Sequence, residues 1–172
     1  MPHQPTGPNR RYFLGCWTRL AVGSAAWPLA AHAARAPVSG TRELALDHTH
    51  TRERISLVYA AGDQYLPQAM GRLNHFLRDH YSGMVGAIDP QLMDLLHRIR
   101  QTLDTDQPFQ VISAYRSPAT NQRLRSTRSG GVATRSLHMD GKAIDIRIPG
   151  VPLGELRDAA LSLKAGGVGA YA

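Results

Sequence analysis

Helix-like and strand-like stretches follow one another in an irregular order, and this order constrains the fold more than any other feature. Four stretches predict short strands, the first two joined as a hairpin: 43–47, 54–60, 109–114 and 142–148. Four more predict helices, which begin near Pro67, Pro90, Pro118 and Pro152. Because the order repeats no strand–helix–strand unit, we expect the α+β class.

The first 33 residues have the composition of an export signal. Arg10 and Arg11 stand side by side before Tyr-Phe-Leu, a weakly apolar stretch follows over 20–31, and Ala-His-Ala at 31–33 fits a cleavage site. The paired arginines are typical of twin-arginine signals. We therefore expect a signal peptide at 1–33, a Pro-, Gly- and Ser-containing linker at 34–42, and one domain at 43–172, with the periplasm as the location.

Charge and cysteine content exclude several classes. The chain of 172 residues carries a formal charge of +7, but the predicted signal holds three of its 20 basic residues, so the remainder is only mildly basic. No stripe of interleaved basic and aromatic residues supports a nucleic-acid partner. The single cysteine excludes a disulfide scaffold, and no apolar run is long enough to span a membrane.

The stretch from Tyr115 to Asp145 carries the residues most suited to chemistry. His138 and Asp145 are seven positions apart with Gly141 between them, so a chain reversal at the glycine would bring imidazole and carboxylate together. Both groups bind zinc, and a catalytic zinc needs three such ligands and an open position. Asp145 stands among apolar residues and therefore needs a partner, for which either a metal or Arg116 would serve.

The motif Ser-x-His-x-x-Gly-x-Ala-x-Asp, preceded by Tyr-Arg-Ser-Pro, resembles the zinc D-Ala-D-Ala peptidase superfamily. Within it the chain is similar to the DUF882/YcbK-like (MepK-like) branch of exported murein endopeptidases, over roughly residues 43–171. The resemblance implies a small mixed or antiparallel sheet with flanking helices. It also implies Zn²⁺ as cofactor, peptidoglycan as partner, and hydrolysis of a peptide bond in the murein stem or cross-bridge.

Carried over to this chain, the resemblance makes His138 and Asp145 zinc ligands. Arg116 would orient the peptide or stabilise the oxyanion, as a guanidinium with forked donors can. Ser136 would hold the ligand loop and contact substrate.

The chain departs from the family after Tyr171. The family places its third ligand, a histidine, in a Phe-x-His-x-Asp-like strand beyond this point, and its acidic general base is expected there too. No histidine follows His138 in this sequence. We therefore expect the final strands to be missing and the chain as given to be inactive or nearly so.

The remaining histidines are expected to be structural. His48 and His50 would lie in the hairpin loop, with metal binding a minor alternative, His75 and His80 would lie on the surface, and His97 would be partly buried. Two other functions remain open: a non-catalytic peptidoglycan-binding module that keeps the peptidase fold, and a basic nucleic-acid binder. The export signal disfavours the second.

Overall fold

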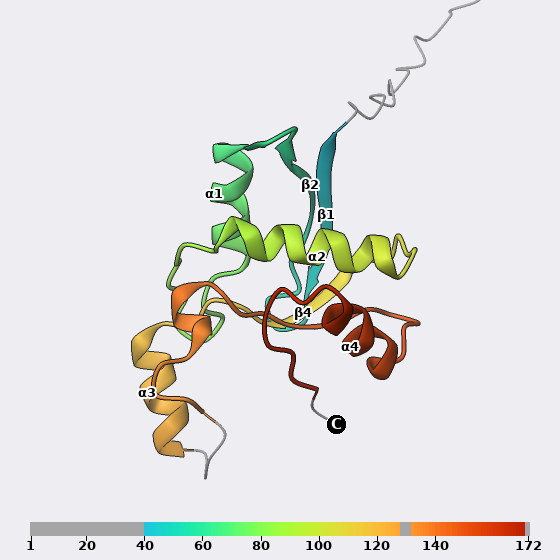
Figure 1. Cartoon of the computed structure of the whole chain (residues 1–172). Coiled ribbons are helices and arrows are strands. Elements are labelled where there is room, and N and C mark those ends of the chain that lie inside the picture. Colours follow the sequence, from blue (N-terminus) through green and yellow to red (C-terminus); the bar gives the residue numbers. More distant parts are fainter. Residues whose placement is uncertain (1–39, 128–131, 171–172) are drawn as a thin grey trace, which may run out of the picture. The chain divides into compact units, whose positions relative to one another are not determined.

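In the computed structural model, residues 40–127 and 132–170 are described, and they form a mixed sheet with helices packed on it (Figure 1). The predicted signal peptide and most of the predicted linker lie outside these residues, as do positions 128–131. No helix of the described part is long and apolar enough to cross a membrane.

The sheet has five strands in the order β3-β2-β1-β4-β5. Their bounds are β1 Thr41–His48, β2 Arg54–Ala61, β3 Gln64–Tyr65, β4 Phe109–Ser113 and β5 Asp145–Arg147. β1 runs parallel to β4, and the other pairs are antiparallel. The predicted α+β class and mixed sheet are confirmed. The sequence analysis missed β3 and extended the last strand to both sides of β5.

Four α-helices and one 3-10 helix complete the described part. Their bounds are α1 Pro67–Phe76, α2 Pro90–Thr102, α3 Pro118–Thr127, η1 Leu137–Asp140 and α4 Leu153–Ser162. α2 begins as predicted, because the Asp89 carboxylate accepts the backbone N–H of Gln91 and proline follows at the first helical position. α1 ends at Phe76, and η1 was not predicted.

One hydrophobic core joins the sheet to the helices. Leu44 and Leu46 of β1 are buried against residues of α1 and α2, among them Leu73 and Met93, which are fully buried. The alternation of buried residues along β1 and the three- and four-residue spacing along the helices produce this core.

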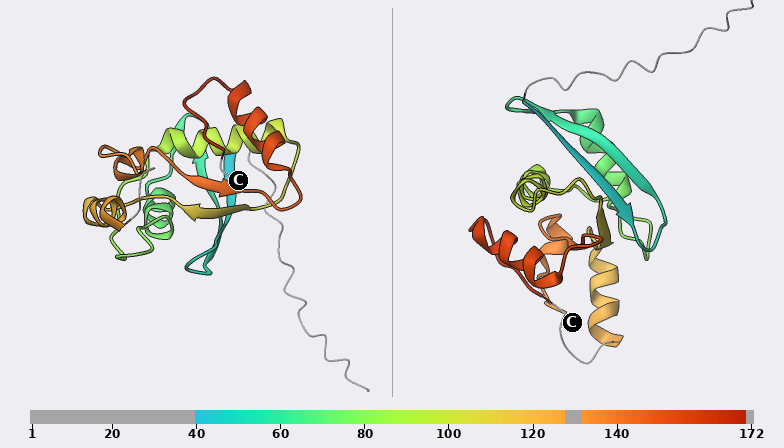
Figure 2. Two further views of the ribbon diagram at one scale, coloured as in Figure 1. Left: turned by 90° about the horizontal axis from the view of Figure 1, so that it is seen from below. Right: turned by 90° about the vertical axis from the view of Figure 1, so that its right-hand side faces the viewer.

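α3 and η1 lie side by side in all views of the molecule (Figures 1 and 2). Asn121 of α3 donates its side-chain N–H to the carbonyl oxygen of Ala133, so the helix is tied to the segment that leads into η1. The contact therefore holds α3, which follows β4, beside the segment that precedes β5. The candidate site lies where these two parts of the chain meet.

Candidate active site

His138 and Asp145 come together as the glycine between them predicts. Gly141 ends η1 with φ of 65°, and a Cβ at this position would overlap the carbonyl oxygen of Ala87. Only glycine satisfies both conditions without strain. The chain then turns into β5, which begins at Asp145, and His138 Nε2 lies 3.6 Å from Asp145 Oδ2.

The tautomer of the neutral His138 ring follows from the partner of its Nδ1. Nδ1 lies 2.7 Å from the carbonyl oxygen of Ala114, which can only accept, so Nδ1 carries the proton. In the neutral ring, Nε2 then presents a lone pair toward a carboxylate oxygen of Asp145. A backbone carbonyl that holds Nδ1–H is also the usual support of a metal-ligating histidine.

The pair fits a zinc ion by this chemistry. Two ligands about 2 Å from a tetrahedral zinc are separated by about 3.3 Å, close to the spacing of Nε2 and Oδ2. The His138 side chain is mostly buried and that of Asp145 is 40% exposed, so the pair borders solvent. Within residues 40–127 and 132–170, however, no third histidine, cysteine or acidic side chain joins them to form a three-ligand group.

Arg116 is held beside this pair at both its backbone and its side chain. Its backbone N–H donates to the carbonyl oxygen of His138 over 3.1 Å, and one guanidinium nitrogen lies 3.4 Å from Asn121 Oδ1. The sequence analysis offered Arg116 as one possible partner of Asp145. Among the ion pairs of the described residues, Asp145 is paired with His138 instead.

Ser136 is buried at the entrance to η1. Its carbonyl oxygen accepts the N–H of Met139 and so helps to close the 3-10 turn that carries His138. Its hydroxyl makes no capping hydrogen bond. Ser136 therefore shapes the ligand loop through its backbone.

The predictions for His48 and His80 were wrong. His48 ends β1 rather than lying in the loop, and it is only 2% exposed because β1 pairs with β4 at this point. Its Nδ1 accepts the backbone N–H groups of His50 and Thr51. His80 is half-buried and its ring stacks on that of His50 at 4.2 Å, whereas His75 is exposed as expected.

This histidine cluster does not form a metal site. Because Nδ1 of His48 accepts two N–H groups, Nε2 carries the proton in the neutral ring and offers no lone pair. Burial, reinforced by the neighbouring His80 and His50, lowers the pKa of His48 to about 4. The buried ring of His48 is therefore neutral near pH 7, and its Nδ1 accepts the N–H groups that close the hairpin.

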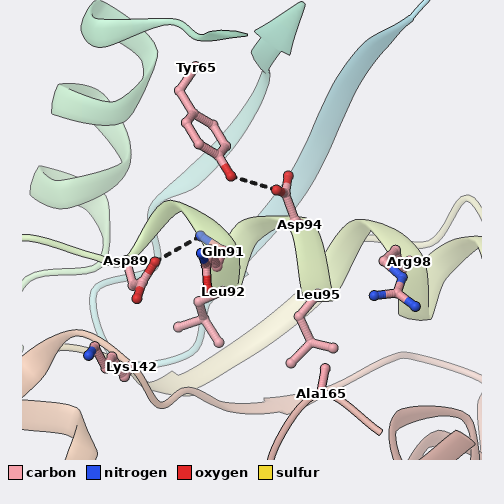
Figure 3. A pocket seen from close by; sticks show the side chains of 9 residues that line it. All are labelled: Tyr65, Asp89, Gln91, Leu92, Asp94, Leu95, Arg98, Lys142 and Ala165. Carbon is pink, nitrogen blue, oxygen red and sulfur yellow. Dashed lines mark hydrogen bonds between the residues drawn. The ribbon is translucent and has the colours of Figure 1, made fainter. Parts of the chain in front are cut away.

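A separate pocket lies between α2 and the segment after α4 (Figure 3). Its acidic groups are already engaged: Asp89 caps α2, and Asp94 accepts the hydroxyls of Tyr59 and Tyr65 and pairs with Arg42 at 3.1 Å. None of the predicted site residues lines this pocket. We therefore place the candidate site at His138 and Asp145.

Comparison with known proteins gives the family of the chain. The family described as "Peptidoglycan L,D-endopeptidase MepK" matches residues 36–172. The chain belongs to this family. It is 42% identical over 163 residues to the peptidoglycan L,D-endopeptidase MepK of Escherichia coli K12, covering 95% of this chain and 88% of that protein. It is 37% identical over 131 residues to a probable MepK of Haemophilus influenzae, covering 76% and 70%. No solved structure matches the chain.

Proposed function

We propose that the protein is a zinc-dependent murein endopeptidase that cleaves peptide bonds in peptidoglycan cross-bridges. The observation that carries the proposal is the His138–Asp145 pair, with Nδ1 of His138 held by a backbone carbonyl and Nε2 turned to the carboxylate. Membership of the MepK family supports murein as substrate, and the names of its relatives support an L,D bond as the scissile bond.

In this proposal each site residue has one task. His138 Nε2 and Asp145 hold the zinc, which when bound polarises the carbonyl and lowers the pKa of its water to about 7. Arg116 orients the peptide and stabilises the oxyanion through its N–H donors. Ser136 keeps the ligand loop in place and lines the substrate path. Water adds to the carbonyl carbon, the C–N bond breaks, and the amine leaves with a proton.

We further propose that the chain as given has impaired activity. Its described residues supply two of the three ligands that catalytic zinc sites use. The same observation favours the second candidate, a peptidoglycan-binding module that keeps the fold without catalysis.

Zinc titration of the purified chain tests the metal site. We expect one zinc per chain, with an affinity lowered by about a hundredfold or more in His138→Ala and unchanged in His75→Ala, since His75 is an exposed histidine of α1. Equal affinity of the two variants would refute the assignment.

Digestion of isolated sacculi separates the two functions. Release of fragments from L,D-linked material, lost on chelation and restored by zinc, would support the endopeptidase. Binding of the chain to sacculi without release, weakened by Arg116→Ala, would support the binding module. If the chain neither binds nor cleaves sacculi, both proposals are wrong.

We propose that residues 1–33 export the protein to the periplasm by the twin-arginine route. The linker predicted at 34–42 ends before β1, whose first residues are Thr41 and Arg42, and the peptidase domain begins there. A fusion of residues 1–33 to a folded reporter should reach the periplasm, and replacement of Arg10 and Arg11 by lysine should retain it in the cytoplasm. Export that is indifferent to both arginines would contradict the signal type.

A further inference from the structure

Asp79 is a fully buried carboxylate that the proposed chemistry does not use. It follows the end of α1, and its residue is 1% exposed. Burial raises the pKa of a carboxyl group, but the hydrogen bonds from Ser117, Thr120 and Ser82 together outweigh this effect and hold the pKa of Asp79 well below its usual range. An ionised carboxylate at such a depth is tolerated only where several donors satisfy it.

Four donors surround this carboxylate. Oδ2 accepts the hydroxyl of Ser117 over 2.6 Å, the backbone N–H of Ser117 over 3.0 Å and the hydroxyl of Ser82 over 2.8 Å. Oδ1 accepts the backbone N–H of Tyr81 over 2.9 Å. Ser117 gives both its N–H and its O–H to one oxygen, so the carboxylate fixes the backbone at this residue.

The segment 114–117 lies between Asp79 and the candidate site. On one side, Tyr115 N–H donates to the carbonyl oxygen of Leu77, and Ser117 binds Asp79. On the other side, Arg116 N–H donates to the carbonyl oxygen of His138, and Ala114 accepts the proton of His138 Nδ1. Alternate residues of one short segment therefore connect a buried anion to the metal-ligand loop.

The side chain of Arg116 depends on the same anchor. Its guanidinium contacts Asn121 of α3, and the first turn of α3 is capped by Ser117, whose hydroxyl oxygen accepts the N–H of Thr120. Because Asp79 orients that hydroxyl by accepting its proton, it stabilises the start of the helix that carries Asn121.

We propose that Asp79 is a positioning residue: by anchoring Ser117, it sets the placement of Arg116 for murein binding and, separately, the placement of the His138 ring. This inference rests on the proposed function, because it gives Arg116 its task. It differs from a purely structural role in one respect: the effect of Asp79 on substrate must pass through Arg116.

Asp79→Asn is the test substitution, because it keeps the volume and removes the charge. Its NH₂ group must face either Tyr81 N–H or the three donors at Oδ2, and even where its oxygen faces Ser117 the hydrogen bonds lose the charge that strengthens them. The matched control is Asp94→Asn, which also removes a partly buried carboxylate that accepts two hydroxyls, but one that has no hydrogen bond or ion pair with segment 114–117. Should Asp79→Asn not fold, Ser117→Ala takes its place as the test substitution. It removes the hydroxyl contacts with Asp79 and Thr120 and keeps the backbone N–H of Ser117 on Asp79.

Affinity for an L,D-linked muropeptide is measured in a double-mutant cycle on the full chain. We expect Asp79→Asn to weaken binding about tenfold or more, and to weaken it less than about twofold further when Arg116 is already alanine. Asp94→Asn should lower the unfolding temperature without changing affinity. An equal fold-loss in both backgrounds, or none in either, would overturn the proposal.

A second readout does not depend on murein. In NMR spectra of the free chain, Asp79→Asn should shift the Arg116 amide and the His138 ring nitrogens, and Asp94→Asn should leave them unchanged. If the wild-type chain binds no muropeptide, the proposed function fails and these shifts decide whether Asp79 positions the two residues. Unchanged signals would refute it whatever the binding result.

Discussion

The buried ring of His48 makes the stability of the domain depend on pH, in a direction and by an amount that the structure determines. Protonation at Nδ1 would remove the acceptor of two backbone N–H groups and place a charge beside His80, His50 and Arg78. The pKa of His48 is accordingly lowered, first by burial and then by the neighbouring histidines, from 6.5 to about 4.

The sign follows from which state takes up the proton first. The unfolded chain protonates this histidine near pH 6.5 and the folded chain only near pH 4. The stability due to neutral His48 is therefore complete above about pH 7 and is lost as the pH falls to about 4. The difference between the two pKa values amounts to about 3 kcal/mol over this range.

The perturbation is His48→Asn, whose Oδ1 can replace Nδ1 as acceptor but does not titrate. Near neutral pH we expect the variant to be less stable than the wild type, because it lacks the imidazole ring that packs against Phe76. On acidification to about pH 4 that deficit should shrink by about 3 kcal/mol.

Urea unfolding followed by circular dichroism at a series of pH values measures this change. His75→Asn is the control, since it removes an exposed histidine, and its stability curve should run parallel to that of the wild type. If His48→Asn also runs parallel to the wild type across the range, the reasoning on His48 is refuted.

Three further substitutions test other parts of the structure. Gly141→Ala should destabilise the fold by about 2 kcal/mol or more and weaken zinc binding, because its Cβ would overlap the Ala87 carbonyl at a positive φ; chemical unfolding and zinc titration measure the two effects. Leu73→Ala should cost about 2–5 kcal/mol in urea unfolding, since the side chain is fully buried. Arg78→Met should cost about 1 kcal/mol or less, and less still in high salt, because its two-bond pair with Glu53 is partly exposed.

The pair at the centre of the candidate site could be predicted because its geometry is local. His138, Gly141 and Asp145 lie within eight residues, and a glycine between two polar side chains indicates a tight reversal of the chain. The 3-10 turn was not predicted, since four residues with no periodic pattern leave no signal of their own. The turn at Gly141 is enough to bring His138 and Asp145 together, so their proximity could be predicted without the 3-10 turn.

Asp79 and His48 were not recognised, and the reason is the distance along the chain to their partners. Ser117 is 38 positions from Asp79, and the burial of His48 depends on the parallel pairing of β1 with β4. His48 is the last residue of β1 and Asp79 lies in the loop after α1, and polar residues at such positions are ordinarily solvated. Only a buried environment distinguishes them, and the sequence around each contains no such indication.

The candidate site is built from segments that lie far apart in the sequence. Its parts come from the loop after α1, the segment after β4 and the turn before β5, and backbone hydrogen bonds join the three at Tyr115 and Arg116. Backbone hydrogen bonds do not depend on the identity of the side chain, so residues of the segment can be replaced while these hydrogen bonds are kept. The exceptions are residues whose side chains replace a backbone partner, and Asp79 is one of them. A carboxylate that accepts both donors of Ser117 fixes the position of the residue before it, and that residue is Arg116.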